Sequence, residues 1–267
     1  MDGRIRKLRE IVRGIGPSVL AFSGGCDSTF LACVARDVLG EKLLCVTLVS
    51  PFLSGEEKRE AARLAGNLGV RHRFLKAPLP RSLSRNPRLR CYFCKKNDYS
   101  LLKRLAAKCG LAAVMEGTNA DDGADYRPGM RAVREQGVRS PLLEAGLSKK
   151  EIRALSRKMG LVTWDKPSQA CLASRFPYGE RFTVRKLRMV EKAEAHIRGL
   201  GIRQVRVRYH GPVARIETGK DELPKLLRNG CQVSDALRKI GFKYAAVDLK
   251  GYRTGSMNEA IGWKRKK

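Results

Sequence analysis

A short apolar run, SVLAF at residues 18–22, ends directly in a glycine turn, SGGCDS at residues 23–28. The run predicts a buried strand, and a helical pattern follows from about Asp27 to Leu39. Two adjacent glycines let the backbone approach an anion closely, and a helix N-terminus offers that anion unpaired N–H groups. The sequence therefore predicts a strand–turn–helix unit that can hold a phosphate.

Strands and helices alternate through the first part of the chain. Further strands are expected at 43–49, 73–76 and 112–115, and helices at 55–68 and 92–107, with a loop rich in proline and arginine at 78–90. Such alternation predicts a parallel sheet covered by helices on both faces, hence an α/β fold. Ligands of these sheets bind at the carboxyl ends of the strands.

The pattern changes near residue 176. Ser148 and Glu151 form a capping box that opens a helix, and residues 163–181 show no periodicity. Helices then follow at 183–197, 221–229 and 233–240, and strands at about 205–209, 213–218 and 244–249. We therefore expect two domains, residues 1–175 with the parallel sheet and residues 176–267 as a smaller α+β domain.

The glycine turn carries side chains suited to a nucleotide. The candidates for ATP binding are Ser23, Gly24, Gly25, Asp27 and Ser28. A carboxylate among phosphates makes sense if it helps to hold Mg²⁺, and the alternative is a tight turn with a helix cap. The Walker spacing and its lysine are absent. SGGCDS resembles the loop of the PP-loop ATP pyrophosphatases, which cleave ATP between the α and β phosphates and adenylate a substrate.

Two other groups of polar residues are candidate ligands. Asn119, Asp121 and Asp122 follow a predicted strand end, where they can bind ATP, Mg²⁺ or substrate, although turn chemistry also explains them. Arg206 and Arg208 alternate with apolar residues and project from one face of a strand. Their guanidinium groups suit a substrate phosphate, and the alternative is a solvated arginine pair.

Three of the eight cysteines have a spacing that favours a metal site. Cys91 and Cys94 share one helix face, and the helix N-terminus with its basic neighbours favours thiolates. Zinc, redox and iron–sulfur uses compete for one CxxC pair. Cys171 adds a third sulfur, which suits a [4Fe–4S] cluster with one open iron better than a zinc site. The remaining cysteines are expected to be small core residues; they are Cys26, Cys33, Cys45, Cys109 and Cys231.

The charge of the chain is strongly positive. Lys and Arg total 55 against 26 acidic residues, a formal net charge of +29. This field attracts anions, including nucleotides and nucleic acid, or else reflects a solvated basic surface. RNA binding is not favoured, because aromatic residues are only 6% and none alternate with basic residues. The sequence has no membrane-spanning run and begins with a charged, periodic segment, so we expect a cytoplasmic protein.

Longer segments resemble one family in particular. The chain is similar to the LarE family, the ATP-dependent sulfur transferases that build the nickel-pincer nucleotide cofactor. The resemblance covers nearly the whole chain, in SGGCDS, CYFCKK, EGTNADDGADYRPGMRA, RSPL, TWDKPSQACLASRFPYGE, VRVRYHGPVARIE and GYRTGS. It implies an adenine nucleotide alpha hydrolase-like (PP-loop) domain, followed by a domain for substrate binding or oligomerisation.

The resemblance also implies a chemistry. In that family a carboxylate of a pyridinium mononucleotide is adenylated and converted to a thiocarboxylate, with ATP and Mg²⁺. Some members sacrifice a cysteine at the Cys171 position. Others carry cysteines matching Cys91, Cys94 and Cys171, bind a [4Fe–4S] cluster and transfer a sulfide from its open iron; this chain resembles the second branch. Catalytic roles are then expected for Asp27 and Cys171.

The partners expected from the resemblance are a small-molecule mononucleotide and further copies of the chain as a homo-oligomer. The source of the sulfide is not indicated by the sequence. A PP-loop tRNA thiolation enzyme is the alternative, because it shares the ATP chemistry and its substrate suits the positive charge. A nucleotide-binding regulator would leave the cysteines unexplained.

Overall fold

The structure, a computed structural model, describes residues 2–124, 128–167, 170–253 and 256–257. By their internal contacts they form two compact units, Met1–Leu83 with Arg88–Gln169, and Ser84–Pro87 with Ala170–Lys267. The sequence placed the boundary between residues 175 and 176, whereas the chain enters the second unit at Ala170 and visits it earlier at Ser84–Pro87.

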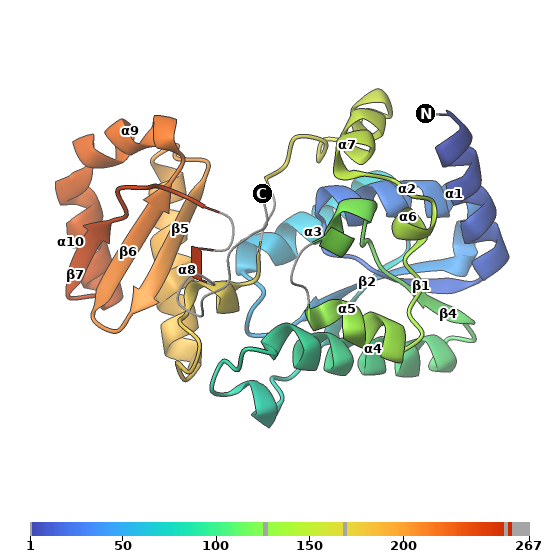
Figure 1. Ribbon diagram of the computed structural model, residues 1–267, viewed down its shortest axis with the longest axis horizontal. Coiled ribbons are helices and arrows are strands. Elements are labelled where there is room, and N and C mark those ends of the chain that lie inside the picture. The colour runs from blue at the N-terminus through green and yellow to red at the C-terminus, as the bar shows by residue number, and fades with distance from the viewer. Residues whose placement is uncertain (1, 125–127, 168–169, 254–255, 258–267) are drawn as a thin grey trace. The chain divides into compact units, whose positions relative to one another are not determined.

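The first unit contains a four-stranded sheet in the order β3-β2-β1-β4, and all its pairings are parallel. Its strands are β1 (Ser18–Ala21), β2 (Leu43–Val49), β3 (His72–Lys76) and β4 (Ala113–Met115) (Figure 1). The central strands are nearly continuous apolar runs because both of their faces are covered. The predicted α/β fold with a parallel sheet is confirmed.

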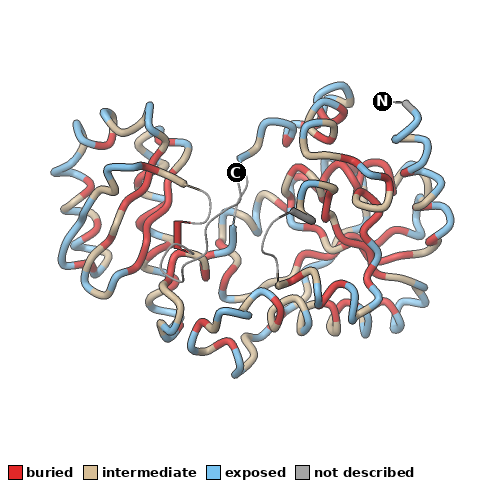
Figure 2. Tube along the Cα trace, viewed as in Figure 1, coloured by how far each residue is buried: buried red, intermediate tan, exposed pale blue. Residues whose placement is uncertain are grey.

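Helices form two apolar cores with this sheet. One core joins the sheet to α1 (Asp2–Ile15), α2 (Cys26–Leu39), α3 (Gly55–Leu68), α6 (Pro141–Glu144) and α7 (Lys149–Lys158). The other joins it to α4 (Arg90–Lys108) and α5 (Pro128–Glu135). Figure 2 shows the resulting band of buried residues along the strands. The helices α1, α5 and α6 were not predicted from the sequence.

Local hydrogen bonds explain where two of these helices begin. The predicted capping box before α7 is confirmed, since the Ser148 side chain accepts from the Glu151 N–H and Glu151 reaches back to the Ser148 N–H. Ser54 and Glu57 form a second capping box before α3. Both pairs satisfy N–H groups that a helix leaves unpaired at its N-terminus, so the starts of α3 and α7 are firmly defined.

The second unit is a smaller α+β structure, as predicted. Its sheet has the order β5-β6-β7, with β5 antiparallel to β6 and β6 parallel to β7. Its elements are α8 (Val184–Gly199), β5 (Val205–His210), β6 (Val213–Thr218), α9 (Leu223–Arg228), α10 (Gly230–Ile240) and β7 (Tyr244–Val247). The helix α8 packs against β5, and α10 packs against α8 and β7.

No helix in the described parts of the chain combines the length and the apolar character needed to cross a membrane.

Candidate active site

The glycine turn between β1 and α2 has the shape of a phosphate cradle. Gly24 adopts φ +68°, and a Cβ there would lie 3.3 Å from the Ala61 Cα on α3, so only glycine fits without strain. The Ser23 hydroxyl accepts from the Gly25 N–H at 3.3 Å and lies 3.0 Å from the Ser28 hydroxyl. Gly25 is the N-cap of α2 and has no side chain to accept from its first-turn N–H groups. These N–H groups can therefore face an anion.

The loop after β4 packs directly on the start of α2. A Cβ on Gly117 would lie 3.1 Å from the Ser28 nitrogen and 3.3 Å from its Cα. Just beyond, the Asn119 amide reaches the Asp27 carboxylate at 3.5 Å. The structure thus brings the predicted residues of two segments, 23–28 and 119–122, to the same edge of the sheet.

The acidic residues after β4 also form a compact turn. The Asp122 carboxylate accepts from the Asn119 N–H at 3.1 Å, and the Asn119 side chain accepts from the Asp121 N–H at 3.0 Å. Asp121 in turn accepts from the Lys149 N–H at 2.8 Å. Turn chemistry therefore accounts for part of this cluster, and the contact of Asn119 with Asp27 ties the turn to the phosphate cradle.

A lysine that sequence reasoning missed is paired with Asp27. The Lys149 ammonium donates to both carboxylate oxygens of Asp27 at 2.7 Å. Lys149 is the first residue of α7, directly after the N-cap Ser148. The capping box in the sequence located this helix start, but it gave no sign that the helix begins beside the glycine turn.

A pocket of about 270 Å³ opens beside the cradle. It is lined by Ala21, Ser23, Gly25, Asp27, Ser28, Lys95, Tyr99, Glu116 and Gly117. Glu116 accepts from the Ser140 hydroxyl at 2.6 Å and from the Thr118 N–H at 3.1 Å, and it pairs with Lys95 at 3.4 Å. Burial acts to raise the pKa of Glu116, but Lys95 and these hydrogen bonds outweigh it, so the pKa lies below its usual value. Glu116 is therefore an ionised residue in the wall of the pocket that the glycine turn also lines.

The CxxC pair begins the helix that carries Lys95. Cys91 is exposed and Cys94 is half-buried, one turn apart near the N-terminus of α4. The Cys94 thiol donates to the Asp98 carboxylate at 3.4 Å, and burial raises the pKa of Asp98 to about 6. The start of α4 thus carries both Lys95, which lines the pocket beside the cradle, and the two cysteines.

Cys91 and Cys94, two of the three predicted cluster ligands, lie near the start of α4. Cys171 belongs to the second unit, so the three-cysteine set stays a prediction. Within the described parts of the chain, no three His, Cys, Asp or Glu side chains gather as a metal site.

The other five cysteines divide into two groups. Cys26, Cys33 and Cys45 are buried as expected, and burial raises the pKa of Cys45 to about 12. The expectation of a core position is wrong for Cys109 and Cys231, which are exposed. Cys109 directly follows the last residue of α4, and Cys231 lies in the first turn of α10. Apolar residues beside Cys109 and Cys231 in the sequence therefore did not correctly predict whether these cysteines are buried.

The exposed Cys171 directly precedes a short 3-10 helix, Leu172–Arg175. The last residue of this helix, Arg175, binds the backbone just before it. The buried Arg175 guanidinium donates to the carbonyl oxygens of Ala170 at 2.6 Å and Cys171 at 3.2 Å. It also pairs with Glu194 of α8 at 2.7 Å. The backbone at Cys171 is therefore anchored to the core of the second unit while its side chain is exposed.

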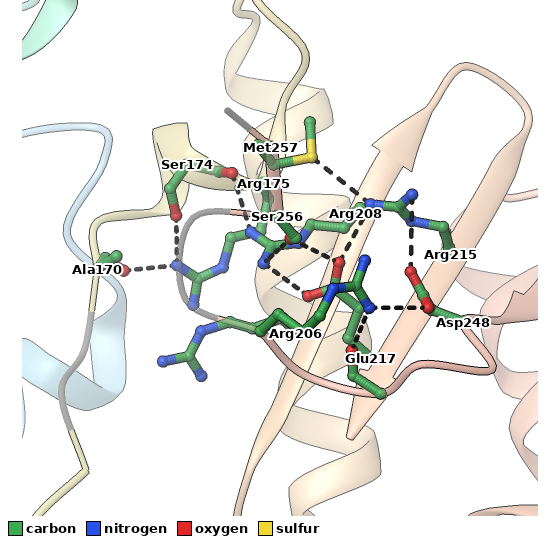
Figure 3. A network of polar contacts seen from close by, with 12 residues as sticks. Ala170, Ser174, Arg175, Arg206, Arg208, Arg215, Glu217, Asp248, Ser256 and Met257 are labelled. Atoms are coloured by element: carbon green, nitrogen blue, oxygen red, sulfur yellow. Dashed lines mark hydrogen bonds and ion pairs between the residues drawn. The ribbon is translucent and has the colours of Figure 1, made fainter. Parts of the chain in front are cut away.

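Arg206 and Arg208 leave the same face of β5, as predicted, but both are buried, so the alternative of a solvated pair is wrong (Figure 3). Arg208 pairs with Glu217 at 2.6 Å and donates to the Ser256 hydroxyl at 3.0 Å. It also donates to the Ser174 carbonyl at 3.0 Å, beside the Cys171 turn.

Arg206 has a different environment. Its guanidinium lies 5.3 Å from the centre of the Tyr252 ring and donates to the Val205 carbonyl at 2.8 Å. Burial lowers the pKa of Arg206, and the nearby charge of Arg175 adds to this effect. A bound anion would offset both effects, because it would neutralise a region where guanidinium groups crowd together.

The sequence of this chain is similar to those of known proteins. The NAD synthase family matches residues 5–80, the part that contains the glycine turn. The chain is 40% identical over 265 residues to an uncharacterized protein of Synechocystis sp., covering 98% of this chain and 99% of the relative. It is 39% identical over 245 residues to pyridinium-3,5-bisthiocarboxylic acid mononucleotide synthase of Lactiplantibacillus plantarum, covering 91% of this chain and 89% of the relative.

A further relative matches a short part of the chain. The glutamine-dependent NAD(+) synthetase of Aquifex aeolicus is 47% identical over 66 residues, which are 24% of this chain and 12% of that protein. The match to the L. plantarum synthase extends over both units, because it covers 91% of this chain. The chain therefore belongs to the same family as this pyridinium-3,5-bisthiocarboxylic acid mononucleotide synthase, the LarE family of PP-loop enzymes.

Proposed function

We propose that the protein is an ATP-dependent sulfur transferase of nickel-pincer cofactor biosynthesis. It adenylates a carboxylate of a pyridinium mononucleotide and converts it to a thiocarboxylate. The observation that carries the proposal is the phosphate cradle at residues 23–28, with Asp27 at its edge, in a chain that matches the L. plantarum synthase across both units.

The first half-reaction explains why ATP is needed. A carboxylate is a poor electrophile, because its negative charge repels nucleophiles. Its oxygen attacks the α phosphorus of ATP, the bond to the bridging oxygen breaks, and pyrophosphate leaves with that electron pair. The N–H groups at the start of α2 and the Ser23 and Ser28 hydroxyls would hold phosphate oxygens. Asp27 would hold Mg²⁺ together with the phosphates, which suits an ion that uses one or two protein carboxylates.

The acceptor carries a phosphate that requires its own site. Arg206 is the best candidate for this role, because its buried guanidinium lies close to those of Arg175 and Arg208. Arg208 is already paired with Glu217, and we assign it to shaping the site together with the Cys171 turn.

In the second half-reaction, sulfide attacks the acyl carbon of the adenylate, and AMP leaves with the electron pair of the broken C–O bond. Cys91, Cys94 and Cys171 would hold a [4Fe–4S] cluster. When bound, such a cluster supplies a fourth iron for an exchangeable sulfide. Cys91 and Cys94 lie three residues apart at the start of α4, so both sulfurs could reach one cluster.

Two measurements test the proposal. Incubation with ATP, Mg²⁺ and the carboxylated pyridinium mononucleotide should yield AMP and pyrophosphate, whereas tRNA should yield neither. AMP formation with tRNA alone would instead assign the chain to tRNA thiolation, and no AMP with either substrate would indicate a regulator.

The sulfur donor is tested by variants. Anaerobically reconstituted protein should hold about four irons per chain, and Cys91→Ala, Cys94→Ala and Cys171→Ala should each lose iron and sulfur transfer but keep adenylation. Cys109→Ala is the matched control, since Cys109 is an exposed cysteine on the other end of α4. If only Cys171→Ala loses sulfur transfer, Cys171 is itself the donor, and mass spectrometry should then find dehydroalanine at position 171 after turnover.

A further inference from the structure

Lys166 joins the glycine turn to α3. Its ammonium donates to the Gly24 carbonyl oxygen at 2.9 Å and to the Glu60 carboxylate at 2.6 Å. Glu60 belongs to α3, and only 13% of the Lys166 side chain is exposed. Lys166 and Glu60 together line an open hollow of about 460 Å³, which is separate from the pocket beside the cradle. The ammonium therefore contacts the turn through a backbone carbonyl, from the side of α3.

The backbone of Lys166 is held by a different helix. The Arg153 guanidinium, on α7, donates to the Lys166 carbonyl oxygen at 2.8 Å and to the Trp164 carbonyl oxygen at 2.9 Å. Pro167 follows Lys166 and restricts its backbone to extended conformations. The position of Lys166 is thus determined by α7 and by its own sequence, so its ammonium can support the glycine turn from outside.

The peptide group between Gly24 and Gly25 has a definite orientation. In a planar trans peptide the C=O and N–H groups point in opposite directions. The carbonyl points to Lys166, and the Gly25 N–H points to the Ser23 hydroxyl, which lies 3.0 Å from the Ser28 hydroxyl. Neither glycine has a Cβ, so a half-turn of this peptide plane meets little steric resistance. The rotated peptide would present a carbonyl oxygen to a bound phosphate in place of an N–H group.

We propose that Lys166 is a positioning residue of the ATP site, which acts on the backbone of the turn and not on the nucleotide. Its charge-assisted hydrogen bond holds the Gly24 carbonyl away from the anion and keeps the Gly25 N–H available to a phosphate oxygen. Glu60 neutralises the ammonium, so the lysine adds no net charge at this place. This inference rests on the proposed function, because it explains how the cradle for ATP keeps its shape.

The proposal predicts that loss of the ammonium affects binding of ATP and not the chemical step. In Lys166→Met the rotated peptide becomes more populated, and the apparent ATP affinity falls with the fraction of protein that keeps the competent orientation. ATP should bind about tenfold or more weakly, the effect of losing one charge-assisted hydrogen bond. Saturating ATP selects the competent orientation, so KM for ATP should rise while kcat for AMP formation changes little.

The experiment is calorimetric titration of ATP in excess Mg²⁺ into the full-length protein, followed by steady-state measurement of AMP formation. Lys166→Arg keeps a charged donor and should restore most of the ATP affinity, and Lys166→Gln keeps an uncharged donor and should give an intermediate affinity. Lys158→Met is the matched control, because Lys158 is an exposed lysine at the end of α7 and should leave ATP affinity unchanged. Thermal unfolding of each variant shows that the fold is retained.

Three outcomes would overturn the proposal. If Lys166→Met binds ATP as tightly as the unaltered protein, the peptide keeps its orientation without the ammonium. If Glu60→Gln, which retains an acceptor for the ammonium, weakens ATP binding as much as Lys166→Met does, the ion pair matters and the carbonyl contact does not. If kcat falls while KM is unchanged, Lys166 acts in the chemical step. The proposed function fails separately: weaker ATP binding by Lys166→Met, in a protein that forms no AMP with the mononucleotide, would support the role of Lys166 and refute the sulfur-transfer assignment.

Discussion

Arg208 and Glu217 form an ion pair at 2.6 Å inside the second unit, with only 6% and 0% of their side chains exposed. Glu217 also accepts from the Ser256 hydroxyl at 2.9 Å and pairs with Arg215 at 3.1 Å. Removing one partner of a buried pair leaves an uncompensated charge, which destabilises a protein by about 3–5 kcal/mol. Arg208 is therefore expected to be needed for the stability of the second unit.

Substitutions of Arg206 and Arg208 should have different effects on acceptor binding and on stability. Arg206→Met should weaken binding of the mononucleotide about tenfold or more, because it removes a charge-assisted contact to phosphate. Arg208→Met should lower the free energy of unfolding by about 3–5 kcal/mol. Calorimetry of the acceptor and denaturant unfolding measure the two effects, and ATP affinity should be unchanged in Arg206→Met. Equal losses of acceptor binding and of stability in both variants would contradict this division of roles.

The pair of Arg175 and Glu194 should make the stability of the second unit depend on pH. Burial acts to raise the pKa of Glu194, but Arg175 and the hydrogen bonds to Glu194 outweigh it, so the pKa lies below its ordinary value of 4.5. A carboxyl whose pKa is lowered on folding stabilises the fold above its unfolded pKa and loses that contribution as pH falls through the folded pKa.

Denaturant unfolding of Glu194→Gln at several pH values checks this expectation. The variant should be less stable than the unaltered protein at pH 7, by about 3–5 kcal/mol. The difference should begin to shrink below pH 4.5. Arg188→Gln on the same helix is the control: Arg188 pairs with Glu191 but is 58% exposed, so its loss should change stability by less than about 1 kcal/mol. A pH-independent difference for Glu194→Gln would show that the lost contacts are not electrostatic.

Adenylation should depend on the first turn of α2. Asp27→Ala and Ser28→Ala should abolish formation of AMP and pyrophosphate while the protein stays folded, because both side chains face the proposed phosphate site. Chromatography of the nucleotide products measures this, and thermal unfolding controls for the fold. Normal AMP yield from both variants, or ADP as the product, would refute the PP-loop assignment.

The close approach of Gly117 to Ser28 provides a steric test. Gly117→Ala places a methyl group 3.1 Å from the Ser28 nitrogen, tighter than an ordinary contact, so α2 must shift at its first turn. ATP affinity should fall, because the N–H groups of that turn are its expected ligands. Gly66→Ala on α3 is the control, since a Cβ there meets nothing within 4 Å. Equal ATP affinity in the two variants would show that the turn tolerates the shift.

Local patterns in the sequence predicted the elements that local forces determine. The run SVLAF and the turn SGGCDS predicted β1, the cradle and α2, and the capping box at Ser148 predicted the start of α7. Alternation at residues 205–209 predicted that Arg206 and Arg208 share one face. These predictions needed only hydrophobic period, backbone conformation and hydrogen bonding within a few residues.

Local sequence patterns could not predict contacts between segments that lie far apart in the sequence. Lys149 lies 122 positions from Asp27, and their pairing depends on how α7 packs against α2. Likewise, alternation showed that Arg206 and Arg208 share a face but not that this face is covered. Glu194, on α8, pairs with Arg175. The helical pattern of α8 alone does not reveal that Glu194 is buried.

The early visit of the chain to the second unit limits how the protein can be divided. Asn86 is fully buried there, and its amide donates to the carbonyl oxygens of Phe176 at 3.0 Å and Pro177 at 2.6 Å. A fragment that begins at Ala170 would lack Asn86, and the two carbonyl oxygens would lose the hydrogen bonds that its amide donates. Exchanging the second unit between relatives therefore requires Ser84–Pro87 to be transplanted as well, and a chimera joined at a single point should fold poorly.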